Sequence, residues 1–448
     1  MSFTRQGRTA LIAGLAAGAL TLSACSAGSL GSPSSAPASP GGSAPAANVE
    51  ITWLVDNAEN TVKAAEARAK AFSDAKQGVT VKVETRPQGA DGDNLVKTRL
   101  ATGEMTDVFS YNSGSLMAAL DPANNLVPLT NEPYMANVLD AFKPSVTSGK
   151  ELYGIPDGQA MGGGILYNKK VFADLGLQVP KTWADFMANN KKIKDAGIDP
   201  VIQSYGETWT SQLFILADFH NVTAVQPDWA EKYTANQAKY VDEPAIKGFQ
   251  RLEEVHKAGY LNKDFASTKY DQGLQKLVAG KGAQYPMLTF AVSNYVPLSD
   301  TAAEDIGFFA QPGDDASTYG LTAWEPGAFY IPTTTKGEKL DAVKKFLAWI
   351  ATPAACDVQS AAVAPSGPYL IKDCKLPDGL PAAVNDLQQF FNDGNVSPAL
   401  EFLSPIKGPN LEKITVEVGS GITSAADGAA RYDEDVKKQA QQLGLEGW

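Results

Sequence analysis

The feature that most constrains this chain is a regular alternation of strand and helix patterns in its first third. The apolar run at residues 51–55 is typical of a buried strand. The pattern then predicts a helix ending before Gly78, a strand at 79–83, a helix around 95–100 and a strand at 107–111. This β-α-β-α-β order predicts an α/β fold with a parallel sheet covered by helices.

The alternation restarts after residue 150. Residues 153–156 and 165–167 have strand character, and a helix should open at Thr182, whose hydroxyl can cap it with Asp185 three residues later. Further helices are predicted at 211–219, 244–257, 270–279, 338–350 and about 411–422. No repeat of solenoid or propeller length is present. The 448 residues are enough for two or three domains.

The N-terminus predicts export. Arg5 and Arg8 precede an uncharged, largely apolar stretch at 10–24, which is shorter than the roughly 20 residues a membrane-spanning helix needs. It ends in Leu22-Ser23-Ala24-Cys25, which resembles the lipobox of bacterial lipoproteins. The resemblance implies removal of a signal peptide at 1–24 and lipidation of Cys25; the alternative is a plain secretory signal. Residues 25–48 are dominated by Ser, Pro, Ala and Gly and predict a flexible tether.

The remaining cysteines, Cys356 and Cys374, are predicted to form a disulfide, because thiols outside the cytoplasm are commonly oxidised. Two free buried thiols are the alternative. Cleavage before Cys25 would remove two arginines and no acid, taking the formal net charge from −12 to −14. A chain this acidic lacks the basic surface that nucleic-acid binding needs.

Enzyme and metal signatures are mostly absent from the sequence. It has no nucleophile elbow, no phosphate loop and no dinucleotide fingerprint. The chain's two histidines, His220 and His256, are interpreted as structural, and no metal or other cofactor is expected. A glycosidase with a carboxylate pair is not excluded by motif, since the spacing of carboxylates in space is not visible in sequence.

An ordered series of short motifs resembles the extracellular solute-binding proteins of bacterial ABC importers, in the sugar-binding branch that includes maltose-binding protein. The motifs are KTRLATG at 97–103, DVF at 107–109, LVPL at 126–129, YGIP at 153–156, LYNK at 166–169, GLQVPKTW at 176–183, AGIDP at 196–200, GKGA at 280–283 and KFL at 345–347. Thr106 stands where the family usually has proline. The similarity covers roughly residues 49–360.

This resemblance implies two α/β lobes of the type II periplasmic-binding-protein kind, with a ligand cleft between them. We expect lobe 1 to comprise residues 49–156 and 308–362, and lobe 2 residues 157–307 and 363–448. The crossings are placed near 155–158, 307–312 and 362–369, where Pro365, Gly367 and Pro368 suit a bend. Ligand contacts made by both lobes would favour the closed state.

Candidate ligand-binding residues come from two arguments. In open α/β sheets the site lies beyond the carboxyl ends of strands, and sugars need polar partners for hydroxyls and aromatic rings for their C–H faces. That selects Asp56, Asn57, Asn112, Ser113 and Asp157, with Trp324 and Glu325 in a Gly/Pro-rich loop. The family resemblance adds Glu207, Trp209 and Phe290.

The sequence therefore predicts a lipid-anchored, monomeric carbohydrate-binding protein that delivers its ligand to an ABC permease without catalysing a reaction. The same fold also serves other small solutes. A polyamine would need acids around an aromatic box, which Asp56, Asp157, Glu207 and Glu325 could supply. A surface-anchored glycosidase is the alternative from a different class.

Overall fold

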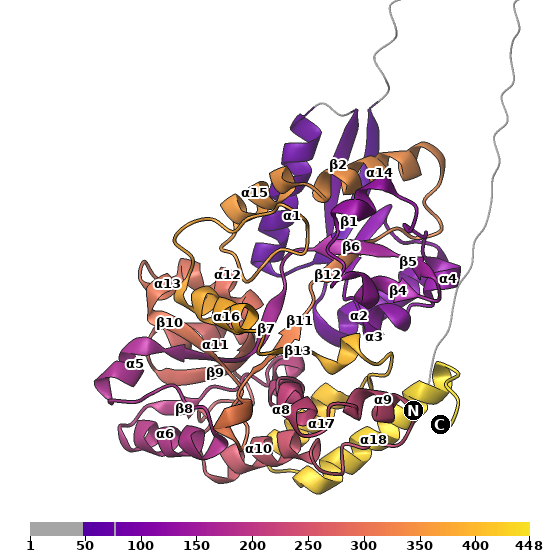
Figure 1. Ribbon diagram of the computed structural model, residues 1–448. Coiled ribbons are helices and arrows are strands. Elements are labelled where there is room, and N and C mark those ends of the chain that lie inside the picture. The colour runs from indigo at the N-terminus through magenta and orange to yellow at the C-terminus, as the bar shows by residue number, and fades with distance from the viewer. Residues whose placement is uncertain (1–47, 76–77) are drawn as a thin grey trace, which may run out of the picture. The chain divides into compact units, whose positions relative to one another are not determined.

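A computed structural model describes residues 48–75 and 78–448. The predicted signal peptide, Cys25 and nearly all of the tether lie outside these residues. The described chain is built on two larger sheets, and we call the elements around each sheet the first and second lobes (Figure 1). Figure 1 shows β1 and β2 of the first sheet in indigo beside α14 and α15, with β12 of the same sheet in orange.

The first sheet has the order β2-β1-β3-β12-β6. Its strands are β1 (Val49–Asp56), β2 (Val79–Arg86), β3 (Val108–Tyr111), β6 (Gly154–Asp157) and β12 (Gly327–Tyr330). β1 pairs in parallel with β2 and β3, as the alternation predicted, while β12 pairs antiparallel with β3 and β6. The helices of this lobe include α1 (Glu59–Asp74), α2 (Gly89–Thr102), α3 (Ser115–Ala118), α4 (Pro122–Asn125), α14 (Gly337–Ile350) and α15 (Pro353–Ala362).

The core of the first lobe explains why α1 covers this sheet. The apolar face of α1 buries Ala65, Ala69 and Phe72, as the helical spacing predicted. The ring of Phe72 lies 5.2 Å from that of Phe346 on α14. Trp53 on β1 is fully buried beneath both helices and contacts Phe346 at 5.6 Å. The apolar stripe of each helix therefore closes one continuous core over the strands.

The second sheet has the order β13-β11-β7-β9-β8, with β10 also paired to β7. Its strands are β7 (Met161–Asn168), β8 (Asp199–Val201), β9 (Gly282–Leu288), β10 (Ile306–Ala310), β11 (Leu321–Trp324) and β13 (Val396–Pro398). Its helices include α5 (Lys169–Asp174), α6 (Trp183–Asp195), α8 (Phe219–Val225), α9 (Trp229–Thr234), α10 (Ile246–Lys257), α11 (Tyr270–Val278), α12 (Val292–Tyr295), α13 (Ala302–Asp305), α16 (Ala382–Asp393), α17 (Leu411–Gly419) and α18 (Ala425–Gln442).

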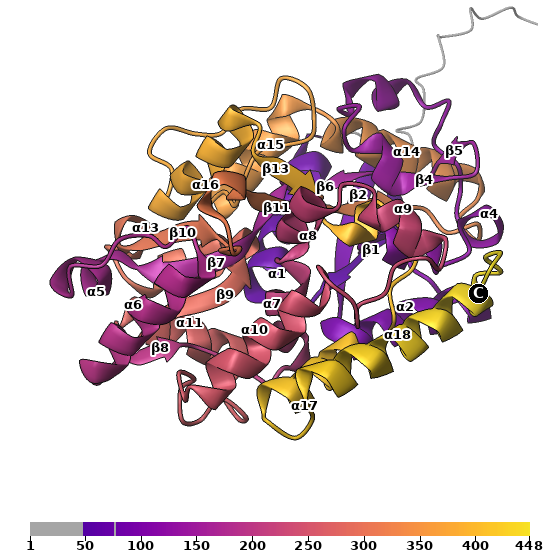
Figure 2. The same cartoon turned by 60° about the horizontal axis from the view of Figure 1, so that its bottom comes forward.

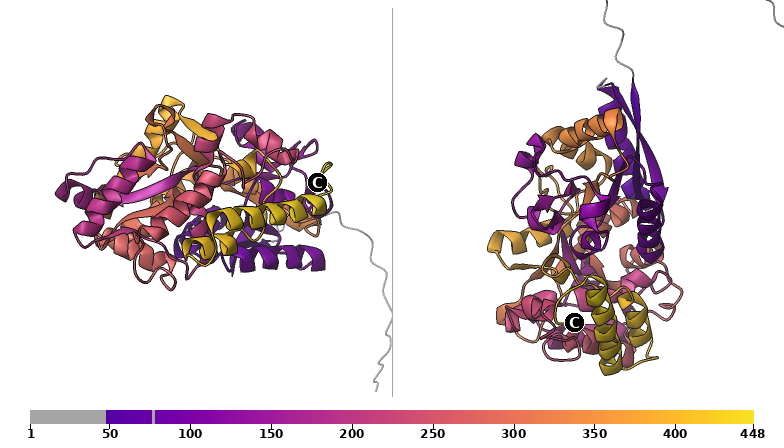
Figure 3. Two further views of the ribbon diagram at one scale, coloured as in Figure 1. Left: turned by 90° about the horizontal axis from the view of Figure 1, so that it is seen from below. Right: turned by 90° about the vertical axis from the view of Figure 1, so that its right-hand side faces the viewer.

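The C-terminal helices complete the second lobe. Figures 2 and 3 show α17 and α18 in yellow, with α10 beside them in Figure 2. The rings of Phe249 on α10 and Tyr432 on α18 are 6.3 Å apart. Both are buried in a core that also includes Leu411 and Ile414 of α17. These helices therefore belong to the packed body of the lobe.

Two of the three predicted crossings between lobes need correction. The chain first leaves β6 for β7 at residues 158–160, next to the predicted 155–158. The second crossing was expected at 307–312, but β10 and β11 both pair with β7, so the chain crosses at Glu325 and Pro326. The cause is antiparallel pairing between strands more than a hundred residues apart, which a local pattern does not encode.

The third crossing also lies later than predicted. Tyr369, Leu370 and Ile371 pack in the core of the first lobe, and Leu139 N donates to the Leu370 carbonyl at 2.9 Å. Ala364, inside the predicted segment, contacts the core of the second lobe, but after the return at 369–371 the chain packs in the second lobe from Leu380 and α16 onward. Cys356 on α15 and Cys374 form a disulfide, which confirms the predicted pair and ties this segment to the first lobe.

The predicted helix starts and stops are mostly confirmed. Thr182 caps α6, its hydroxyl accepting a hydrogen bond from Asp185 N. The single helix predicted at 211–219 is wrong. That region contains a short 3-10 helix, η3 (Thr208–Gln212), then α7 (Leu213–Leu216), and α8 follows. Thr322 Oγ1 bonds the carbonyl of Ala217 and the His220 N–H, which holds the break between α7 and α8.

The histidines are placed among structural partners. The His220 ring contacts Ser397 Oγ and the Thr318 carbonyl, and His256 packs edge-on against Phe265. Within the described chain no three potential ligands gather in a metal-binding arrangement. None of the helices in residues 48–75 and 78–448 combines the length and hydropathy of a membrane-crossing segment.

Candidate functional site

Three adjoining pockets form a cleft between the lobes, and residues of both lobes line each of them. The outer pocket has a volume of about 780 Å³ and is lined by Asn57, Gln88, Asp91, Glu207, Trp209, Tyr270, Asp271, Asn294 and Glu412, among others. The hinge pocket, about 400 Å³, lies against the crossing residues Gly158, Gln159, Glu325 and Pro326. A side pocket of about 310 Å³ is lined by Arg86, Ser115 and Lys407, among others. Gln88 and Trp209 line all three pockets.

All ten predicted ligand-binding residues line this cleft. Asn57 and Glu207 line the outer pocket, and Trp209 lines every pocket. The hinge pocket gathers Asp56, Asn112, Ser113, Asp157, Phe290, Trp324 and Glu325. The geometry therefore brings together residues spread over 270 positions of sequence, from Asp56 to Glu325.

The first lobe contributes residues from the ends of strands. Asp56 ends β1, and its carboxylate accepts a hydrogen bond from Ala58 N at 2.9 Å. Burial raises the pKa of Asp56, against the lowering effect of that bond and of Arg86. Ser113 follows β3 and donates to the Pro326 carbonyl at 2.8 Å, so it joins the sheet to the second crossing. Polar groups at the cleft are thus fixed by the local backbone.

Asp157 forms an ion pair with an arginine of its own lobe. The guanidinium of Arg68 on α1 lies 2.8 Å from the Asp157 carboxylate, and both side chains are nearly buried. The same guanidinium stacks over the rings of Trp53 and Phe329, at 5.0 and 5.5 Å. Arg68 was missed by the sequence reasoning, because a lone arginine on the apolar face of a helix carries no motif. The rings hold the guanidinium in place, and the ion pair occupies one oxygen of Asp157. The other oxygen is left to accept a hydrogen bond.

The second lobe contributes an aromatic group, which we define as Trp209, Tyr270 and Phe290. The ring of Trp209 lies 5.3 Å from Tyr270 and 5.9 Å from Phe290, and Tyr270 and Phe290 are 5.8 Å apart. The three rings come from η3, from the start of α11 and from the segment after β9. Tyr270 was not predicted, because the first residue of an amphipathic helix gives no sign of facing a cleft.

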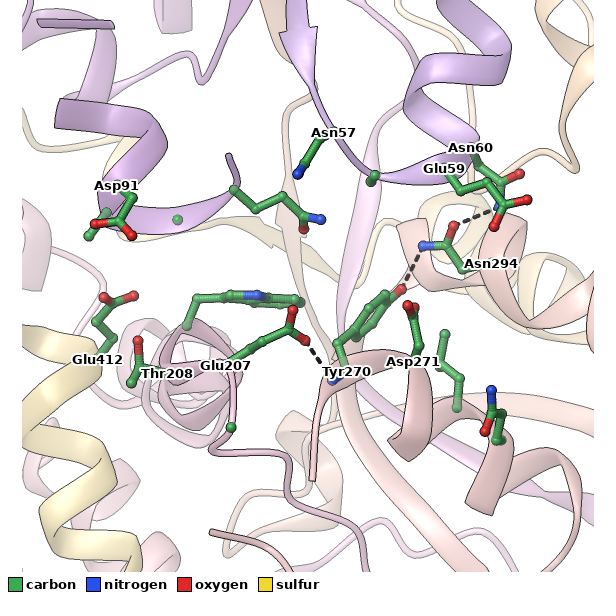
Figure 4. Close-up of a pocket in the computed structure, with 18 of the residues that line it drawn as sticks. Asn57, Glu59, Asn60, Asp91, Glu207, Thr208, Tyr270, Asp271, Asn294 and Glu412 are labelled. Atoms are coloured by element: carbon green, nitrogen blue, oxygen red, sulfur yellow. Dashed lines mark hydrogen bonds between the residues drawn. The ribbon is translucent and has the colours of Figure 1, made fainter. Parts of the chain in front are cut away.

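Glu207 has a local partner in addition to its position in the outer pocket. Its carboxylate accepts a hydrogen bond from Tyr270 N at 2.6 Å, at the N-terminal end of α11 (Figure 4). A carboxylate is favoured there because the first N–H groups of a helix lack partners within the helix. Figure 4 shows Asn57 and Asp91 on the opposite side of the pocket from Glu207 and Tyr270.

Trp324 and Glu325 have different environments although they are adjacent. Trp324 is only 6% exposed, packs over Gly163 and donates its indole N–H to Glu401 at 2.6 Å. A Cβ at Gly163 would lie 2.2 Å from that indole, so a glycine is required there. Glu325, at the second crossing, has a buried carboxylate oxygen with no hydrogen-bond partner in the described chain. Burial raises the pKa of Glu325 to about 7.

The outer pocket is acidic. Its acidic lining residues are Glu59, Asp91, Glu207, Asp271 and Glu412, and Lys413 is its one basic residue in the described chain. None of these five carboxylates forms an ion pair with another described residue. Apart from Glu207, none was predicted, because single acids in helix turns and loops are common on any surface.

Comparison with known proteins places this geometry among relatives. Residues 58–355 match a family model described as bacterial extracellular solute-binding protein. The chain is 25% identical over 307 residues to the multiple sugar-binding protein of Streptococcus mutans serotype c, covering 66% of this chain and 71% of that protein.

Solved structures share the fold. A chitin oligosaccharide binding protein superposes with a TM-score of 0.75 at 21% identity, covering 88% of this chain and 99% of the other. RafE in complex with raffinose gives a TM-score of 0.72 at 19% identity, with the same coverage of both chains. These likenesses confirm the predicted two-lobed α/β fold.

Proposed function

Because this chain belongs to the family of bacterial extracellular solute-binding proteins, we propose that it captures an oligosaccharide in the interlobe cleft and delivers it to an ABC permease. The observation that carries the proposal is the aromatic group of Trp209, Tyr270 and Phe290, which faces polar side chains of the first lobe across the cleft. Rings of this kind match the apolar C–H faces of sugars, and amide and carboxylate groups match their hydroxyls.

Recognition in this proposal is divided between the lobes. The aromatic group would support one face of the sugar, while Asn57, Asn112 and Gln88 of the first lobe would bind hydroxyls. Contacts to both walls form together only when the lobes are closed, so the ligand shifts the population towards the closed state. The combined pockets suit an oligosaccharide, because drug-sized ligands usually occupy about 300–1,000 Å³.

Calorimetry against raffinose, stachyose, chitin oligosaccharides and galactose tests the proposal. At least one sugar should bind, and Trp209→Ala should weaken that binding by roughly thirtyfold to a hundredfold, since a buried aromatic contact contributes about 2–3 kcal/mol. Trp349→Ala is the matched control, because Trp349 is partly buried on α14 against Phe72 and Phe346, in the core of the first lobe. Absence of binding to every sugar, with tight binding of another solute, would contradict the proposal.

A cationic solute such as a polyamine is the second candidate. The observation that favours it is the set of five carboxylates in the outer pocket that lack an ion pair in the described chain. Binding of spermidine that weakens steeply between low and high salt would support this candidate, because screening acts on charge pairs and leaves neutral hydrogen bonds nearly unchanged. Sugar binding that is indifferent to salt would support the oligosaccharide.

The proposal includes no chemical reaction. The relatives are solute-binding proteins, and one oxygen of Glu207 already accepts a backbone hydrogen bond at the start of α11. Turnover of a chromogenic glycoside that disappears in Glu207→Gln would identify a glycosidase instead. Binding without turnover supports a transport role.

The family is extracellular, and the protein accordingly acts outside the cytoplasm. We further propose that Cys25 carries a lipid anchor and that residues 25–48 hold a monomeric body off the membrane. Cys25→Ser should release the protein from the membrane fraction into the medium. Retention of the variant in that fraction would contradict the anchor.

A further inference from the structure

A chain of side-chain hydrogen bonds links the two lobes beside the outer pocket. Asn60 Nδ2, on the first turn of α1, lies 2.6 Å from the Ser293 carbonyl and 2.6 Å from Asn294 Oδ1, both on α12 of the second lobe. Asn294 Nδ2 then donates to the Tyr270 hydroxyl at 2.8 Å. Figure 4 shows the links from Asn60 to Asn294 and from Asn294 to Tyr270, with Tyr270 beside Glu207.

The donors and acceptors give this hydrogen-bond network a direction. The Asn60 amide donates, and the Asn294 amide accepts through its oxygen and donates through its nitrogen. The Tyr270 oxygen therefore accepts one hydrogen bond, and its own hydrogen stays free to donate. Burial raises the pKa of Tyr270 well above its ordinary value, so this hydrogen is retained at physiological pH. Each bond in such a chain polarises the next.

The hydrogen-bond network also reaches the backbone of Phe290, a second residue of the aromatic group. Ser293, whose carbonyl accepts from Asn60, donates through its hydroxyl to the Phe290 carbonyl at 2.9 Å. Asn60 and Asn294 line both the outer and the hinge pocket. The residues that hold Tyr270 and Phe290 in place are therefore engaged by the first lobe only when the lobes are together.

We propose that Asn60 and Asn294 form an interlobe latch that stabilises the closed state and, on closure, fixes the Tyr270 hydroxyl as a hydrogen-bond donor to the ligand. Both are positioning residues that act through Tyr270. The part of this inference that concerns the ligand rests on the proposed function; the part that concerns closure does not. With such a latch the Tyr270 hydroxyl is oriented for the ligand only in the closed state. Closure therefore strengthens ligand binding, and ligand binding favours closure.

The expected effect follows from population arithmetic. Apparent affinity falls in proportion to the fraction of molecules in the binding-competent state. Asn60 makes two hydrogen bonds across the lobes, and losing both should reduce the ratio of closed to open molecules by about tenfold. From an even split between open and closed molecules, this takes the closed fraction without ligand from about one half to about one tenth, and the affinity falls about fivefold.

The test measures closure and binding separately on the full chain. Spin labels on Thr98→Cys of α2 and Lys192→Cys of α6, in a Cys25→Ser background, report the interlobe distance without ligand. Asn60→Ala and Asn294→Ala should lengthen the mean distance or broaden it. Asn94→Ala is the matched control, because Asn94 lines the same pocket and its side chain makes no hydrogen bond within the described chain.

Conservative variants separate the latch from simple loss of packing. Asn294→Asp keeps an oxygen that accepts from Asn60, so it should preserve closure. It also replaces the amide that donates to the Tyr270 hydroxyl by a carboxylate oxygen, so the hydroxyl hydrogen should turn towards residue 294 and away from the ligand. Tyr270→Phe keeps the ring and removes the hydroxyl. Both should therefore leave the ligand-free distance near native while weakening the binding of raffinose, or of whichever sugar of the calorimetry panel binds.

The outcomes distinguish this inference from the proposed function. A ligand-free distance in Asn60→Ala equal to that in Asn94→Ala would overturn the latch, even if sugar binding weakened. A changed distance with no sugar binding in any variant would support the latch and contradict the oligosaccharide. Native affinity in Asn294→Asp and Tyr270→Phe would overturn the role assigned to the Tyr270 hydroxyl.

Discussion

The hinge pocket and the outer pocket use charge in opposite ways. In the hinge pocket Asp157 is paired with Arg68 at 2.8 Å and Glu401 with Lys407 at 3.1 Å, and all four side chains are largely buried. In the outer pocket Glu59, Asp91 and Asp271 are exposed and have no ion pair within the described chain. Charges that are buried and paired are fixed during folding, whereas exposed charges stay hydrated and respond to the ligand and to salt. The charged pairs of the hinge pocket are therefore part of the folded core, whereas the carboxylates of the outer pocket are surface groups.

The largest expected effect comes from breaking the buried pair. Arg68→Met leaves the Asp157 carboxylate nearly buried without its partner and should lower the free energy of unfolding by about 3–5 kcal/mol, measured by urea titration. Adding Asp157→Asn should recover much of that loss, because the uncompensated charge is removed.

The matched control for this variant is Lys70→Met on the same helix. Lys70 and Asp74 form an exposed pair, so its loss should change the free energy of unfolding by less than about 0.5 kcal/mol. Equal effects of Arg68→Met and Lys70→Met would erase the distinction between the two pockets.

The disulfide tests how far the hinge pocket depends on the fold around it. Cys356 and Cys374 are 18 residues apart and enclose the segment that brings Val363, Ala364 and Ser366 to the hinge pocket. Replacing both cysteines by serine should lower the free energy of unfolding by about 3 kcal/mol in the chain-entropy model. Reductant should produce a similar loss in the native protein and none in the double variant. No loss on reduction would contradict a stabilising role.

The sequence predicts the first lobe best, because its signals are local. The strands and helices from β1 to β3 follow from apolar spacing within about sixty residues. The second crossing was misplaced because residues 306–310 and 327–330 are similar apolar runs, and only their pairing with β7 or with β3 and β6 assigns them to different sheets. Such pairing is decided by packing across the whole molecule.

The site divides in the same manner. Asp56, Asn57, Asn112 and Asp157 could be predicted because strand ends converge at one edge of a sheet. Tyr270, Asn60 and Asn294 could not, because each sits in the first turns of a helix and its exposure to the cleft depends on how two lobes meet. The strand-end argument thus finds site residues at the edge of one sheet, and the family resemblance adds Glu207, Trp209 and Phe290 of the second lobe. The residues that are missed lie on helices of both lobes.

Glu325 is a hinge-pocket carboxylate without a cation beside it in the described chain, and burial raises its pKa from 4.5 to about 7. Between those values the folded state holds a proton that the unfolded chain has released. The stability that this group contributes is therefore full below about pH 4.5 and is lost as the pH rises through 7.

Glu325→Gln should accordingly be more stable than the native protein at pH 8 by about 3 kcal/mol and nearly equal to it at pH 4.5. Urea titration at both pH values measures the difference, with the exposed Glu304→Gln as control. Parallel pH profiles of Glu325→Gln and the native protein would show that the hinge carboxylate is hydrated like those of the outer pocket.

The smallest expected effect belongs to the outer pocket. Asp271 is exposed and has no ion pair in the described chain, so Asp271→Asn should change the affinity for a neutral sugar by less than about twofold. The same variant should weaken spermidine binding at about 20 mM salt and have little effect at about 500 mM, because screening shortens the reach of an exposed charge to a few ångströms. A tenfold loss of affinity for a neutral sugar would mean that Asp271 bonds a hydroxyl directly. The charges of both pockets would then have fixed roles, and the pockets would differ only in how far their charged groups are hydrated.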